Sequence, residues 1–64
     1  MEEVIKEALI KRYEGEAASA KANILLYLNN SVGIGEHPDI IASVDSEIEK
    51  LTNAEEKLQT IKNL

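Results

Sequence analysis

The sequence predicts an all-α protein, an antiparallel two-helix hairpin that assembles into a homo-oligomeric bundle, most simply a dimeric four-helix bundle. Two long segments with helical spacing of apolar residues, about 2–29 and about 38–63, flank a short segment with two of the three glycines and the single proline. The chain has 64 residues and no cysteine. A chain this short rarely completes a core alone, so residues 1–64 are expected to form one hairpin domain that associates with further helices.

The first predicted helix, about residues 2–29, is built mostly from good helix formers and contains no proline. Glu2 with Lys6, and Glu7 with Lys11, are favourably ordered i,i+4 pairs. Gly15 costs roughly 1 kcal/mol relative to alanine inside a helix. We therefore expect close packing at Gly15 to be the reason for its presence.

The apolar residues of this first helix form two stripes. One contains Ile10, Tyr13, Ala17, Ala20, Ile24, Tyr27 and Leu28. The other contains Val4, Ala8, Gly15, Ala18, Ala22 and Leu25. At about 100° per residue the stripe centres are roughly 140° apart, so one partner helix covers one stripe only. We expect the bulky first stripe to pack against the second helix and the small second stripe to form the interface between chains.

The second predicted helix, about residues 38–63, begins with Pro38 in the first helical position, His37 as its cap and Asp39 in its first turn. Its apolar residues form a single stripe: Ile40, Ile41, Val44, Ile48, Leu51, Ala54, Leu58 and Ile61. Ile48, Leu51, Leu58 and Ile61 are expected to complete the core. Glu47 and Glu55 are expected to stay solvated at its edges.

The connection at about residues 30–37 is the one segment whose composition suggests a ligand site. Gly33 and Gly35 precede a helix start, where backbone N–H groups can bind an anion. However, no strand precedes these glycines, and Glu36 and Asp39 would repel phosphate. We expect a structural turn instead, for which Gly33, Gly35, His37 and Pro38 are the key residues.

Metal binding and catalysis have weaker support. Glu36, His37 and Asp39 are ligand types that metals use, but three donors within four residues, separated by Pro38, rarely converge on one ion. The sequence leaves open whether copies of this turn meet around an ion at an oligomer axis. The single histidine has no recognisable catalytic partner, so we expect no enzyme activity, cofactor or metal.

The charge balance argues against nucleic acid as a partner. Twelve acidic residues face seven basic ones, for a net charge of −5, whereas phosphate-backbone binding needs concentrated positive charge. Tyr13 and Tyr27 share a helix face but lack the basic neighbours of a base-stacking platform. Glu2 and Glu3 at the start are unlike a secretory signal, and no apolar run approaches a membrane span, so a cytoplasmic protein is expected.

A pattern in the centre of the chain resembles short helical proteins encoded by marine tailed phages. The similarity covers residues 27–40, Tyr-Leu-Asn-Asn-Ser-Val-Gly-Ile-Gly-Glu-His-Pro-Asp-Ile, together with the Ala-Glu-Glu-Lys-Leu run at residues 54–58. This resemblance implies a protein made in the cytoplasm of an infected bacterium. It implies no particular activity.

Taken together, these patterns predict a small non-enzymatic module that associates with itself. The alternative is an acidic accessory protein that binds a larger protein through the second stripe of the first helix. If that stripe joins two chains, Ala18→Glu should dissociate the oligomer and Glu14→Ala should not.

Overall fold

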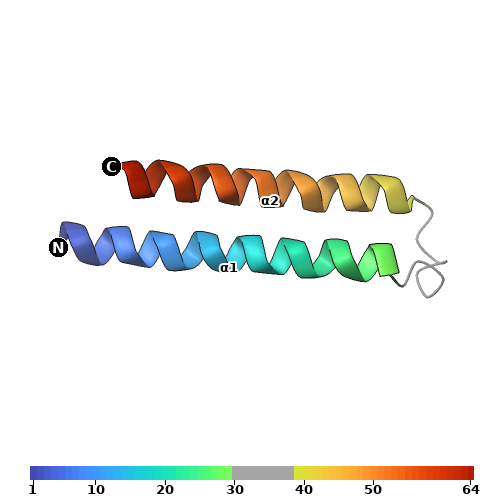
Figure 1. Ribbon diagram of the computed structural model, residues 1–64, viewed down its shortest axis with the longest axis horizontal. Helices are drawn as coiled ribbons and strands as arrows, with labels where there is room; N and C mark the ends of the chain where they lie inside the picture. The colour runs from blue at the N-terminus through green and yellow to red at the C-terminus, as the bar shows by residue number, and fades with distance from the viewer. Residues whose placement is uncertain (30–38) are drawn as a thin grey trace.

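The computed structural model describes residues 1–29 and 39–64, and both parts are helical. Helix α1 spans Glu2–Asn29 and helix α2 spans Ile40–Asn63. The two helices lie side by side and run in opposite directions, with both chain termini at the same end (Figure 1). The predicted all-α antiparallel hairpin is therefore confirmed.

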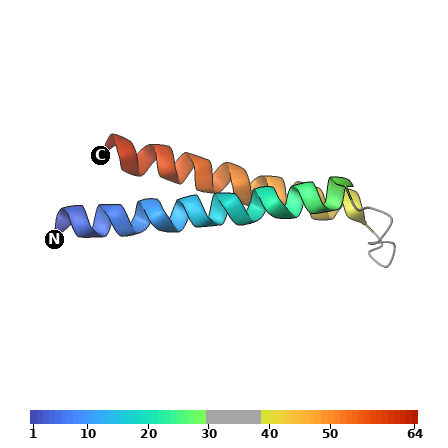
Figure 2. The same cartoon turned by 60° about the horizontal axis from the view of Figure 1, so that its bottom comes forward.

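The molecule is a narrow rod that lacks the bulk of a compact domain. In Figure 2 the two ribbons overlap towards the turn and separate towards the termini, so the helices cross at an angle. The rod measures 48 × 14 × 14 Å, with a radius of gyration of 14.7 Å. A compact domain of this length would have a radius of gyration of about 11 Å. Most side chains therefore keep one side in solvent.

Helix α1 ends at Asn29, in agreement with the predicted end at about residue 29. The Asn29 side-chain amide donates a hydrogen bond of 2.9 Å to the backbone carbonyl of Leu25. This bond holds the side chain of the last helical residue against the final turn of α1. At the other end, Glu2 and Glu3 lie in the first turn, where negative charge favours the positive end of the helix dipole.

Helix α2 begins two residues later than the sequence analysis predicts. Asp39 is its N-cap: one carboxylate oxygen accepts a hydrogen bond of 2.9 Å from the backbone N–H of Ala42. The Ser43 hydroxyl also donates to the Asp39 carbonyl, at 3.1 Å. Aspartate is among the best N-cap residues, because its side chain satisfies a first-turn N–H that otherwise has no acceptor.

The expectation that His37 caps α2 and Pro38 opens it is thus corrected. The capping role belongs to Asp39, which we had placed inside the first turn. His37 and Pro38 lie outside the described residues, as do Gly33 and Gly35.

The contact between the helices uses the bulky first stripe of α1, as predicted, except for Leu28 at its end, which is 64% exposed. Among the described residues only Ala20 and Ala54 are buried, each about 2% exposed, and no large side chain is fully enclosed. The half-buried apolar residues around them are Leu9, Ile10, Tyr13, Ala17, Ile24 and Tyr27 on α1, and Ile40, Val44, Leu51, Leu58 and Ile61 on α2. The hairpin core is therefore a single seam.

Two residues expected in the core of α2 lie outside it. Ile41 is 84% exposed and Ile48 is 46% exposed. Counting about 100° per residue from Ala54, both positions fall roughly 120–140° from the contact direction. The apolar stripe of α2 is wider than the surface that one neighbouring helix can cover.

The second stripe of α1 is exposed along its whole length in the hairpin. Its residues are Val4, Ala8, Gly15, Ala18, Ala22 and Leu25. They lie on the side of α1 turned away from α2, in agreement with the prediction that α2 covers one stripe only. A Cβ added at Gly15 would meet no atom within 4 Å, so the close packing expected at this glycine does not occur within the hairpin.

Candidate functional site

An exposed apolar surface lies next to the turn and is built from both helices. We call it the turn-end patch and define it as Leu25, Leu28, Ile41 and Ile48. Leu28 is 64% exposed, and Leu25, one turn earlier, marks the border where the patch meets the second stripe of α1, to which it also belongs. A shallow groove lined by Leu28, Ile40, Ile41, Val44, Asp45 and Ile48 joins the two helices here.

The helical repeat explains why these side chains meet on one side of the rod. Leu28 lies about 80° around α1 from the buried Ala20, and Ile48 lies about 120° around α2 from the buried Ala54. In an antiparallel pair, residues that are rotated by the same sign from the contact direction, each counted along its own helix, lie on the same flank of the pair. The turn-end patch therefore consists of apolar residues of both helices that lie beyond the helix–helix contact, on one flank.

The opposite flank is polar along its middle, and the exposed side chains of Met1, Ile5, Leu26 and Leu64 fall on its side by the same helical count. A second groove there is lined by residues of both helices, including four of the seven basic residues of the chain: Lys11, Arg12, Lys50 and Lys57. Arg12 pairs with Glu16 at 3.3 Å within α1. The charge balance of the sequence does not reveal this group, because its four cations line one groove only when α1 and α2 pack.

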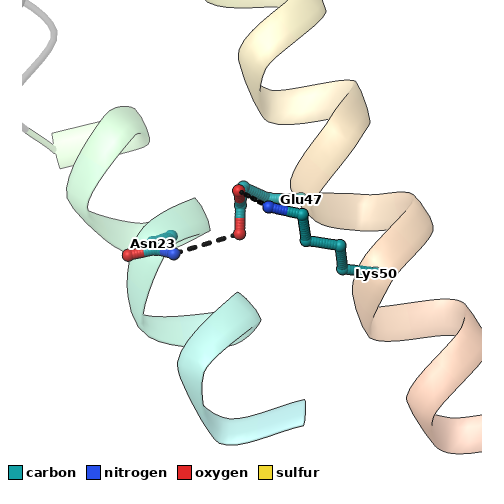
Figure 3. A network of polar contacts seen from close by, with 3 residues as sticks. All are labelled: Asn23, Glu47 and Lys50. Atoms are coloured by element: carbon teal, nitrogen blue, oxygen red, sulfur yellow. Dashed lines mark hydrogen bonds and ion pairs between the residues drawn. The ribbon is translucent and has the colours of Figure 1, made fainter. Parts of the chain in front are cut away.

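The polar flank contains the hydrogen-bonded contact between the helices that Figure 3 shows. The Asn23 side-chain amide donates to one carboxylate oxygen of Glu47 at 3.0 Å, and the Lys50 ammonium donates to the other at 3.0 Å. The Glu47 side chain keeps only 12% of its exposure. The hydrogen bond from Asn23, followed by that from Lys50, holds the pKa of Glu47 below its usual range.

The expectation that Glu47 stays solvated at the edge of the stripe is therefore wrong. Glu47 precedes Ala54 by seven residues, so the two positions lie nearly above one another on the contact face of α2. That heptad spacing was a usable sequence signal. What the sequence could not supply was the position of Asn23 on the facing helix.

Both tyrosines lie on the contact side of α1, as expected for residues at the edge of a core. Tyr13 and Tyr27 are half-buried. The Lys57 ammonium of α2 lies 5.7 Å from the centre of the Tyr13 ring, within the range of a cation–π interaction. The contact between Lys57 and the Tyr13 ring is therefore a second electrostatic contact between the helices.

The described residues show no metal centre. No group of three or more His, Cys, Asp or Glu side chains within residues 1–29 and 39–64 could hold an ion. Glu36 and His37, which were considered as ligands, lie outside those ranges. Neither described helix is long and apolar enough to cross a membrane.

Comparison with known proteins found no match: no protein family, curated protein or solved structure is similar to this chain. The resemblance to phage-encoded proteins stays a prediction. The fold and the site define the protein as a two-helix hairpin with exposed apolar side chains, which include the turn-end patch and the outer side of α1.

Proposed function

We propose that this protein is a non-enzymatic helical module that works by associating with itself, with a dimer as the favoured form. It needs no cofactor, metal, nucleic acid or membrane for that role. The cytoplasm stays the expected compartment, that of an infected host if the phage resemblance holds.

The observation that supports this proposal most strongly is the amount of aliphatic surface outside the seam. Only two alanine side chains are buried in the described residues. The large apolar residues left exposed there are Met1, Val4, Ile5, Leu25, Leu26, Leu28, Ile41, Ile48 and Leu64. Burying one such side chain fully is worth about 1.5–3 kcal/mol, so association has a substantial driving force available.

The total exposed surface area also supports this proposal. The chain exposes 4950 Å², whereas a compact monomer of 7.1 kDa exposes about 4,100 Å². The excess of about 850 Å² is close to the roughly 800 Å² that each partner buries in a standard protein interface. A second copy of similar size would bring the area per chain to the normal value.

A different role, binding of a larger protein, is favoured by one feature, the second stripe of α1, which is exposed along its whole length. Such an accessory protein would be monomeric when isolated, because the missing surface belongs to its partner. The net charge of −5 would then favour a partner with a basic surface.

Light scattering on a sizing column, combined with circular dichroism, separates the two roles. Self-association predicts a mass of at least twice 7.1 kDa with high helicity at low micromolar concentration. A partly helical species of 7.1 kDa would favour the accessory role, because an isolated two-helix seam is only marginally stable.

A further inference from the structure

We infer that the turn-end patch is the surface on which a second copy of this chain docks. The patch of one copy pairs with the same patch of the other around a two-fold axis perpendicular to the helices. This inference rests on the proposed self-association and names the surface and the geometry that produce it.

The patch offers large aliphatic side chains for docking. It consists of leucines and isoleucines from both helices, joined by a groove whose lining includes the half-buried Val44. The second stripe of α1 consists largely of alanine and glycine, which remove little apolar area from water when covered. Burying one residue of the patch therefore contributes more free energy to docking than burying one residue of the stripe.

The patch occupies one flank only. The middle of the other flank presents charged and amide side chains, several already held by Arg12–Glu16 and Asn23–Glu47–Lys50 contacts. Most of its exposed apolar residues, Met1, Ile5 and Leu64, lie at the terminal end of the rod, away from the patch. Covering the charged groups with an apolar surface would strip water from them without new partners. A second copy is therefore directed to the flank that carries the patch.

The charges of the chain favour one orientation of the two-fold axis. A two-fold axis parallel to the helices would stack the hairpins along their full length, placing Glu3, Glu7 and Glu14 beside the same residues of the second copy. With a net charge of −5 per chain, that arrangement is repulsive. An axis across the helices overlaps only the turn-end halves and points the two acidic N-termini in opposite directions.

The patch is tested by placing one charge on it. Ile41→Glu is suitable because this side chain is 84% exposed and takes little part in the hairpin seam; Leu64→Glu, at 85% exposed, is the matched control outside the patch. We expect Ile41→Glu to raise the dimer dissociation constant at least tenfold and Leu64→Glu to change it less than twofold. Equal dissociation constants for the two variants would overturn the inference.

A second pair separates the patch from the outer stripe of α1. Leu28→Glu and Val4→Glu alter side chains of similar exposure, 64% and 68%, one in the patch and one in the stripe. We expect only Leu28→Glu to dissociate the dimer, and Ala18→Glu to leave it intact. If Val4→Glu and Ala18→Glu dissociate it while Leu28→Glu does not, the stripe is the interface; self-association then stands and this inference fails.

The axis is tested with single cysteines in a chain that has none. Asp45 lines the groove, and Lys62 lies 17 residues, about 25 Å, further along α2. An axis through the patch brings the two Asp45 positions together and separates the Lys62 positions by about 50 Å. Upon oxidation, Asp45→Cys should form a disulfide-linked dimer and Lys62→Cys should not. Efficient linking through Lys62→Cys would indicate full-length pairing and contradict the proposed axis.

Failure of the function itself gives a different result. If wild-type protein is a helical monomer at every concentration tested, there is no dimer for any variant to alter, and both proposals fall together. If it is a dimer, the variants decide the surface alone.

Discussion

The Glu47 side chain is the clearest case in which a single residue depends on both helices. Its carboxylate accepts hydrogen bonds from Asn23 across the seam and from Lys50 along α2. Both bonds favour the charged form, which is why the pKa of Glu47 lies below its usual range. Ionised Glu47 therefore contributes to the stability of the hairpin seam.

This contribution has a defined pH dependence. A carboxyl group whose pKa is lower in the folded state stabilises the fold above its unfolded pKa, about 4.3 for glutamate, and loses that effect as the pH falls through the folded value. We expect Glu47→Gln to lower the melting temperature at pH 7 and to have a much smaller effect at pH 3. Thermal unfolding followed by circular dichroism measures both.

Glu55→Gln is the control for this pH effect, because Glu55 is exposed on the same helix. Its substitution should produce little change at either pH. The assignment to Glu47 fails if Glu47→Gln lowers the melting temperature equally at pH 7 and pH 3.

At the scale of the helices, α2 depends on one capping side chain. Asp39→Ala removes the acceptor for the Ala42 N–H and should lower the free energy of unfolding by about 1 kcal/mol, within a range of roughly 0.5–2 kcal/mol. Asp39→Asn keeps an acceptor oxygen and should lose much less. Urea unfolding of the three proteins measures the difference. A loss as large for asparagine as for alanine would show that the cap does not act through this hydrogen bond.

The helices themselves could be predicted because their apolar periodicity extends over many turns. The end of α1 was also predictable, since Asn29 introduces a side chain that bonds back to the helix. The start of α2 was not predicted correctly, because Pro38 offered a strong signal for the first helical position. The aspartate that follows was an equally available capping signal, and it is the one that the helix uses.

The surfaces were harder to predict than the helices. The sequence showed that α1 has an apolar stripe that α2 does not cover, and the exposure of Ala18 and Ala22 agrees with this. It did not show that Ile41 and Ile48 leave the seam, because that depends on how wide a strip the facing helix covers. The turn-end patch combines residues of both helices, so only their packed arrangement brings it together.

At the scale of the whole molecule, the hairpin has regular helices but almost no buried core among the described residues. A single seam centred on two alanines leaves large aliphatic side chains in solvent on several sides. The elongated shape and the excess exposed area have the same cause, because two helices that meet along one contact line do not form an enclosed core. We propose that the helices of a second copy cover that surface.

The most direct test of this account is the solution mass of the wild-type protein, measured by light scattering on a sizing column over a hundredfold concentration range, with circular dichroism on the same samples. The account predicts a mass of twice 7.1 kDa or more that dissociates only upon dilution, with helicity falling as the mass falls. A stable, highly helical monomer of 7.1 kDa across the whole range would contradict it.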